Sequence, residues 1–470
     1  MSSTKKIAAN LFIQIIGKAT TTGIAVVMLA YMARYLGVDK YGDFTTIFAF
    51  LGFFAILSDM GLYTVAVKEM AKNPDRAKKI MGTIFVWRLI LTSMLLIAPL
   101  VAWLVPNYTY DIKIGILVGT ASSFFVGINQ LFVSIFQSNL RMDRLVVSDV
   151  VSRFILFILV MLCIYLELPV IYFVWAYVLG NFSLAAISWM LSRKFLTFRL
   201  NFDLIHMKFI IKEAFPLGAI IILGFIYFKI DTVMLSIMKD SKTVGIYGAA
   251  YKIIEILITI PAMFMGSVFP MVTKYIKEKD YRLKFSFQKS FDFISLMAFP
   301  LLAIFFTMAR PISIFLLGEG FIESAIALQY LAFAMFIIFF GTMMGYFIVA
   351  ADIQKKLVPI YILSVFLNII GNLYLIPRYS YIGASVATIF TELTVCTLAT
   401  IVAIRYFSVF PRWAVFAKSF LAAVAMSGVM YYFAGYNLAL TLAIGIIIYS
   451  LVLLMTGAIS RQSIRETIGI

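Results

Sequence analysis

The sequence predicts an all-α polytopic membrane protein of about fourteen transmembrane helices, each needing roughly 20 apolar residues. Hydrophobic residues make up 63% of the 470 positions, charged residues make up 13%, and the mean hydropathy is +1.02. A soluble domain carries about 45–50% apolar and about 25% charged residues, so this composition excludes a soluble enzyme, a disordered protein and a fibrous repeat. The two-residue alternation typical of a membrane β-barrel is missing, which leaves helices as the spanning elements.

Apolar stretches recur between polar breaks along the whole chain. In order, the expected spans are 7–33, 43–67, 80–104, 112–138, 146–166, 170–191, 210–238, 245–270, 287–309, 325–350, 357–376, 381–404, 413–434 and 437–459. The first span follows Lys5 and Lys6 without a small-residue cleavage site, so we expect a retained span and not a signal peptide.

The distribution of charge predicts the orientation. The net charge is +17, from 39 Lys and Arg against 22 Asp and Glu. In a soluble chain this excess would suggest nucleic acid, but here the basic residues gather in alternate loops, of which 68–79, 193–208 and 274–289 are the richest. The positive-inside rule then places both termini in the cytoplasm, in a multi-pass protein of the cell membrane with no nucleic-acid partner. The opposite loops are too short for a catalytic domain, so we expect no enzyme.

A weak internal repeat predicts two halves. Residues 34–44 (RYLGVDKYGDF) and 239–247 (KDSKTVGIY) each hold a polar turn and then a glycine followed two residues later by an aromatic residue. A second pair, 141–145 and 353–357, has a similar offset. We therefore expect a six-helix lobe at 1–208, a second at 209–410 in the same orientation, and two further helices with a cytoplasmic tail at 411–470.

Basic residues inside the expected spans are the main functional signal. A charge at mid-membrane costs about 2.5–3.5 kcal/mol, so such residues generally face a protein interior or a wet cavity. Lys18, Arg88, Lys229 and Lys252 are the candidates for a cationic cavity, whose natural guest is a phosphate or diphosphate. Arg153 lies nearer the end of its span, where snorkelling to the membrane surface is the favoured interpretation.

Acidic residues inside the spans have two open interpretations. Asp59, Asp231, Glu255 and Glu392 either bind a coupling H⁺ or Na⁺ or orient the cavity cations. Glu255 stands at i,i+3 from Lys252, so these two side chains either neutralise each other or serve the cavity.

Missing motifs exclude several mechanisms. The phosphate-cradling sequence GxxxxGK[ST] does not occur, so transport driven by the chain's own ATP hydrolysis is not expected. The HExxH motif is also missing, and His206 is the only histidine, so we expect no metal site, no catalytic residues and no cofactor.

Five segments together resemble the lipid-linked oligosaccharide (O-antigen-type) flippases, the polysaccharide transporter family of the multidrug/oligosaccharidyl-lipid/polysaccharide (MOP) exporter superfamily. They are 33–44 (ARYLGVDKYGDF), 58–62 (SDMGL), 67–69 (VKE), 228–235 (FKIDTVML) and 244–252 (VGIYGAAYK). Each is degenerate, but their order and spacing agree with the family along essentially the whole chain.

The resemblance implies a flippase with two lobes around a cationic cavity. By alternating access, such a protein carries a polyprenyl-diphosphate-linked oligosaccharide from the inner to the outer leaflet for surface polysaccharide biosynthesis. It implies membrane lipid, H⁺ or Na⁺, and glycan polymerases or glycosyltransferases as partners. Lys18, Lys229 and Lys252, with Arg88 behind them, would contact phosphate or acidic sugar.

Three alternatives stay open. A multidrug or metabolite exporter of the same superfamily would favour an acidic cavity for organic cations, and this chain has slightly more basic than acidic residues in its spans. A membrane glycan polymerase or ligase would need a large outer loop. A scaffold of a biosynthetic complex would transport nothing itself.

Overall fold

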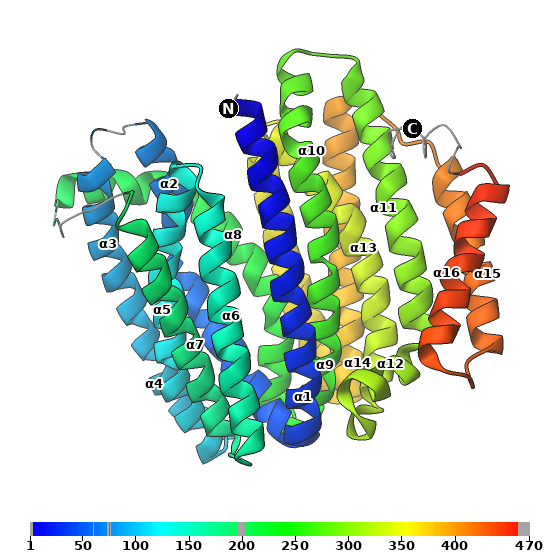
Figure 1. The fold of residues 1–470 in the computed structure, drawn as a ribbon, viewed down its shortest axis with the longest axis horizontal. Coiled ribbons are helices and arrows are strands. Elements are labelled where there is room, and N and C mark those ends of the chain that lie inside the picture. Colours follow the sequence, from blue (N-terminus) through cyan, green and yellow to red (C-terminus); the bar gives the residue numbers. More distant parts are fainter. Residues whose placement is uncertain are drawn as a thin grey trace. The chain divides into compact units, whose positions relative to one another are not determined.

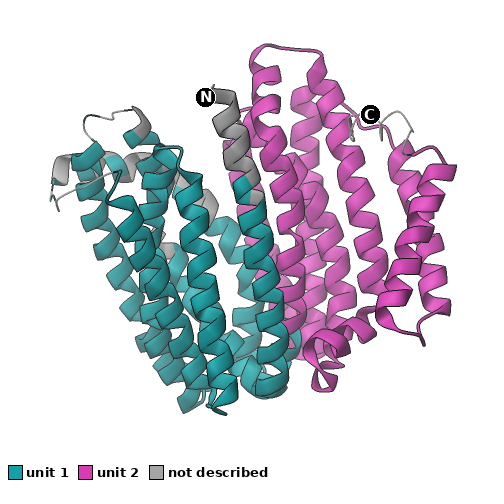
Figure 2. Cartoon of the chain, viewed as in Figure 1, with its two compact units in different colours: residues 1–248 teal, residues 249–470 magenta. Residues whose placement is uncertain are grey.

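The computed structural model describes residues 3–59, 61–72, 75, 77–195, 201 and 203–458. Within these ranges the chain is built of helices and contains no strand (Figure 1). Contacts divide it into two compact units, residues 1–248 and 249–470, each described by itself (Figure 2). This boundary lies inside one helix and differs from the expected boundary between the lobes at 1–208 and 209–410. The expected boundary divides the chain by sequence pattern and stays a prediction.

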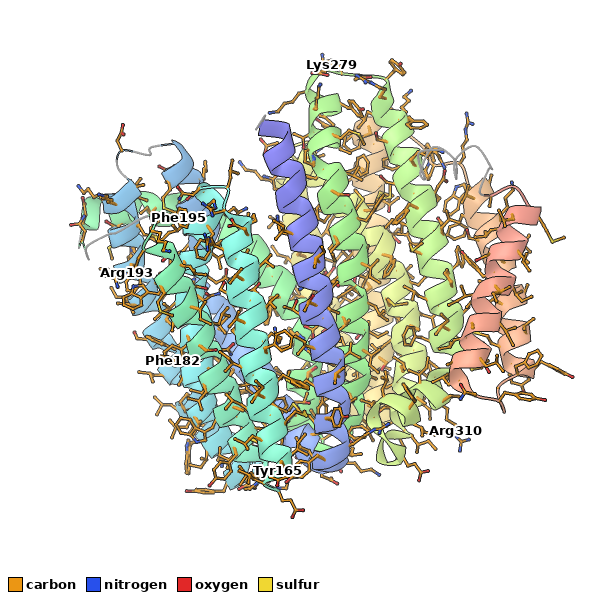
Figure 3. All side chains as sticks on the ribbon, in the orientation of Figure 1. Tyr165, Phe182, Arg193, Phe195, Lys279 and Arg310 are labelled. Carbon is orange, nitrogen blue, oxygen red and sulfur yellow. The ribbon has the colours of Figure 1, made fainter. Side chains whose placement is uncertain are left out.

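The described residues of unit 1 form eight helices and the first part of a ninth. They are α1 (Ser3–Asp59), α2 (Leu62–Lys72), α3 (Ala77–Ser93), α4 (Ile97–Leu104), α5 (Tyr110–Ser138), α6 (Met142–Tyr165), α7 (Val170–Ser192), α8 (Leu204–Met238) and α9 (Ser241–Leu257), with a 3₁₀ turn, η2 (Met94–Leu96), before α4. Successive long helices run in opposite directions. Tyr165, at the end of α6, therefore lies at one end of the unit, and Arg193, after α7, lies toward the other (Figure 3).

Up to residue 458, where the described part ends, unit 2 contains the rest of α9 and seven further helices. They are α10 (Thr259–Lys277), α11 (Arg282–Thr307), α12 (Ala309–Leu317), α13 (Ser324–Ala350), α14 (Leu357–Phe407), α15 (Ala414–Tyr432) and α16 (Leu438–Met455), with 3₁₀ turns η3 (Glu319–Phe321) and η4 (Gln354–Lys356). Lys279 and Arg310 mark the two opposite ends of α11 (Figure 3).

The predicted helical membrane fold is confirmed. Eleven helical segments of the described residues are long and apolar enough to cross a membrane. Two of them each join two helices across a kink, at Gly37 with φ 69° and at Ser380 with φ 54°. All fourteen expected spans fall on helices, so that number is compatible with the structure. The expected span 43–67 is interrupted after Asp59, where Gly61 adopts φ 76° and α2 begins.

The two segments matched by the repeat meet inside unit 1. A Cβ atom added to Gly42 would lie 1.8 Å from the carbonyl oxygen of Ser241, and one added to Gly245 would lie 2.1 Å from the carbonyl oxygen of Val38. Ser241 precedes Gly245 by one helical turn, as Val38 precedes Gly42. The contact is therefore reciprocal, and only residues without a Cβ let α1 and α9 approach so closely.

Candidate substrate and coupling sites

Lys229 and Asp231 lie in the second half of α8, in unit 1. The Lys229 side chain is half-buried, with Nζ 5.5 Å from the centre of the Phe228 ring. Asp231 is 1% exposed, and its Oδ2 accepts a hydrogen bond from the Tyr247 hydroxyl at 3.3 Å. The carboxylate is thus engaged inside the unit, whereas the neighbouring cation keeps part of its surface accessible.

The last turn of α8 is fixed to the core of unit 1 by two hydrogen bonds. Asn107 donates from Nδ2 to the carbonyl oxygen of Ile237 at 2.6 Å, which satisfies one carbonyl in the last turn of α8. The Tyr108 hydroxyl lies 2.8 Å from Ser236 Oγ, and its ring packs edge-on against Phe50. Burial raises the pKa of Tyr108 to about 12, so this phenol stays neutral at physiological pH.

Lys18 lies on α1, and its side chain is exposed. Asp149 and Arg153 of α6 are its charged neighbours, since both Lys18 and Arg153 act electrostatically on the Asp149 carboxylate. Asp149 was not among the residues predicted from the sequence, although it falls inside an expected span.

Arg88 is placed differently from the lysines. It lies on α3 and is 2% exposed, and its Nε donates to the carbonyl oxygen of Gly127 on α5 at 2.9 Å. This hydrogen bond ties α3 to α5, and a Cβ added to Gly127 would press first on Thr92 of α3, at 3.3 Å from its hydroxyl oxygen.

Lys252 and Glu255 face one another on α9, in unit 2. Lys252 Nζ lies 2.9 Å from Glu255 Oε2, and the two side chains are 50% and 29% exposed. The ion pair that the i,i+3 spacing allows therefore forms, and both side chains keep part of their surface exposed.

Glu392 lies on the second half of α14, next in sequence to a buried polar contact between the two halves. Glu392 is 5% exposed. Nearby, Asn368 donates from Nδ2 to Thr391 Oγ1 at 3.3 Å, and Asn372 donates to Asn368 Oδ1 at 2.9 Å. Sequence reasoning found the carboxylate but missed the two asparagines, whose four-residue spacing on one helix was the available signal.

Two further points concern the predicted acids. Asp59 is the last residue of α1, and its side chain lies outside the described residues. Across the described part of the chain, no group of three or more His, Cys, Asp or Glu residues could hold a metal ion.

Eleven helical segments able to cross a membrane, several of them carrying charged side chains, define a multi-pass membrane protein. The chain belongs to the polysaccharide biosynthesis protein family, whose model matches residues 7–276. The model of the MatE family matches residues 216–374. The resemblance read from the sequence motifs is confirmed at this level.

Two relatives come from Haloferax volcanii. The chain is 22% identical over 493 residues to the probable low-salt glycan biosynthesis flippase Agl15, covering 99% of this chain and 97% of the relative. It is also 22% identical over 259 residues to the probable flippase AglR, covering 52% of this chain and 53% of the relative.

Solved structures share the fold. The lipid II flippase MurJ in an inward closed conformation matches with a TM-score of 0.77 and 15% identity, over 96% of this chain and 98% of MurJ. An inward-facing multidrug resistance MATE transporter of the MOP superfamily matches with a TM-score of 0.68 and 14% identity, over 85% of this chain and 98% of that one. The chain therefore has the MOP fold.

Proposed function

We propose that this protein is a flippase that moves a polyprenyl-diphosphate-linked oligosaccharide from the inner to the outer leaflet of the cell membrane. It works by alternating access and uses membrane cations to hold the diphosphate. Both termini face the cytoplasm, as the basic loops require under the positive-inside rule. The relative named as a probable low-salt glycan biosynthesis flippase supports the glycan part of the substrate, and the relative named as a probable flippase supports the flipping activity.

The observation that carries the proposal is the accessibility of three membrane lysines. Lys18 is exposed, Lys229 is half-buried, and Lys252 is 50% exposed. A lysine in a membrane helix is retained where protein or a wet cavity surrounds it. The three are the proposed contacts for the diphosphate, because a compact ammonium ion binds phosphate oxygens well. Arg88 has a structural role, because its guanidinium is buried and hydrogen-bonded across the contact between α3 and α5.

Coupling to an ion gradient is a second part of the proposal. Glu392 is a buried carboxylate next in sequence to Thr391, whose hydroxyl accepts a hydrogen bond from Asn368. Binding H⁺ or Na⁺ would offset the cost of its buried charge. Asp59, Asp231 and Glu255 are the other proposed coupling or orienting acids. We expect Glu392→Gln to remove the response of transport to a collapsed gradient and to leave insertion unchanged.

Purified protein in liposomes tests the function. One arm measures the arrival of a lipid-linked oligosaccharide in the opposite leaflet, and the other measures the export of a fluorescent organic cation. We expect movement of the glycan lipid and not of the cation. Movement of the cation alone would establish the multidrug exporter, and glycan chain growth in the same vesicles would establish a polymerase or ligase. No movement of either would favour a scaffold.

A further inference from the structure

The inference concerns the contact between α1 and α6 in unit 1. These helices lie side by side (Figure 1). A Cβ atom added to Gly17 would lie 2.3 Å from Cγ1 of Val146, so α1 and α6 approach closely at this level. Lys18 is the next residue of α1, so its side chain leaves the helix at the level of this contact.

The face of α6 that touches α1 is charged. Asp149 follows Val146 by three residues and Arg153 follows it by seven, and these spacings place all three on one helix face. Asp149 and Arg153 are half-buried and Lys18 is exposed. The two cations act on the carboxylate electrostatically, so the three side chains form one cluster.

The cluster is not a closed ion pair. Among the described residues, no salt bridge within 4.0 Å and no hydrogen bond engages the charged groups of Lys18, Asp149 or Arg153. The Thr21 and Ser152 hydroxyls donate to the backbone carbonyls of Lys18 and Asp149, not to their side chains. Its net charge is positive, with two cations to one carboxylate. One turn of α1 before and after Lys18, the polar residues Gln14 and Thr21 continue the same face. A partly exposed, net positive face on two apolar helices suits an anionic headgroup.

We propose that Lys18, Arg153 and Asp149 form a phospho-sugar site on unit 1. The two cations bind phosphate oxygens, and the Asp149 carboxylate accepts hydrogen bonds from hydroxyl groups of the first sugar. The carboxylate also disfavours headgroups that carry phosphate without donors, because these meet its charge with no compensating hydrogen bond. This inference rests on the proposed function, adds Asp149 and Arg153 to it, and gives Arg153 a binding role in place of the snorkelling expected from the sequence.

Binding measurements on the full chain in nanodiscs test the site. The probes are polyprenyl diphosphate, polyprenyl diphosphate bearing one sugar, neutral polyprenol and inorganic diphosphate. We expect Lys18→Gln and Arg153→Gln each to raise the Kd for both diphosphate lipids at least about tenfold, because each removes a charge-assisted hydrogen bond. We expect polyprenol binding to stay unchanged. A similar loss for inorganic diphosphate would identify the phosphate as the recognised group, and a loss confined to the lipids would assign recognition to the whole headgroup.

Asp149→Asn separates a binding role from a structural one. We expect it to leave the Kd for polyprenyl diphosphate equal or lower, while abolishing the extra affinity that the sugar confers. Arg144→Gln is the matched control, since it also removes a cation from α6, where Arg144 Nε lies 3.4 Å from Asp143. Kd values for the Lys18 and Arg153 variants within about twofold of the unsubstituted protein would overturn the site, as would equal losses for neutral polyprenol.

The flipping assay, run in parallel, keeps the two proposals apart. If the unsubstituted protein flips the glycan lipid and the variants bind it normally, the site is wrong and the function stands. If the variants lose binding as expected but the unsubstituted protein flips nothing, the site stands and the function is wrong.

Discussion

Gly42 of α1 and Gly245 of α9 pack backbone against backbone in a reciprocal contact. A Cβ atom on Gly42 would lie 3.0 Å from the Gly245 nitrogen, and one on Gly245 would lie 3.2 Å from the Gly42 nitrogen. Beside this crossing, Ser241 donates to Asp43 Oδ1 at 2.6 Å, and Lys40 lies 3.3 Å from Asp43 Oδ2. The two glycines that the sequence repeat aligns therefore lie against each other.

This contact predicts a large effect from one methyl group. Gly42→Ala would place a Cβ atom 1.8 Å from a backbone oxygen, so the helices must separate. We expect a lowered thermal midpoint in detergent and loss of flipping. Gly23→Ala, on the same helix with nothing within 4 Å of its added Cβ, is the control and should leave both unchanged. An unchanged midpoint for Gly42→Ala would show that the crossing contributes nothing to stability.

The buried guanidinium of Arg88 predicts a stability effect and not a specific binding effect. Arg88→Ala leaves the carbonyl of Gly127 without its donor and should cost about 1.5–3 kcal/mol, as expected for a hydrogen bond to a charged group. Denaturant unfolding followed by tryptophan fluorescence measures this cost. Lys78→Ala removes an exposed cation from the same helix and should be neutral. If Arg88→Ala unfolds normally but binds diphosphate lipid more weakly, Arg88 belongs to the binding site.

Tyr108 predicts a dependence of stability on alkaline pH. Its folded pKa of about 12 lies above the ordinary value of 10.0, because burial disfavours the phenolate. The associated stability is therefore fully present below pH 10 and is lost as the pH rises from 10 toward 12, by at most about 1.4 kcal/mol per pH unit. Because other tyrosines and lysines titrate in this range, the quantity to measure is the difference between the unsubstituted protein and Tyr108→Phe. A difference that does not change with pH would contradict the assignment.

The Lys252–Glu255 pair has two open roles, which a charge exchange distinguishes. If the two side chains only neutralise each other, Lys252→Glu combined with Glu255→Lys restores the pair at i,i+3 and should restore transport. We expect transport to stay lost, because the cation would stand one turn away from the phosphate. Correct insertion of both forms is checked by the size-exclusion profile, and recovered transport would assign the pair a purely structural role.

Most of the fold could be predicted from the sequence, because membrane helices are specified by the length of each apolar stretch. All expected spans fall on helices. The interruption at Gly61 was missed, since a single glycine among apolar residues carries no clear stop signal, and only its φ of 76° reveals the break.

The candidate site was harder to predict from the sequence than the fold. The positions of the membrane charges could be read directly, but their surroundings depend on contacts between distant helices. Arg88 is buried because Gly127 of α5 receives it, and Lys18 acquires its charged neighbours because Gly17 brings α6 close. Asp149 was overlooked as one acid in an apolar run, although its four-residue spacing to Arg153 was visible.

Substitution of Lys229 tests whether accessible membrane cations hold the diphosphate of the glycan lipid during flipping. The measurement is the initial rate of flipping in proteoliposomes for Lys229→Gln and for Lys113→Gln. Lys113 is an equivalent control, since it is also half-buried with Nζ 5.5 Å from an aromatic ring, that of Trp103. We expect Lys229→Gln to abolish flipping, while Lys113→Gln retains the full rate. Equal rates for both variants and the unsubstituted protein would contradict it.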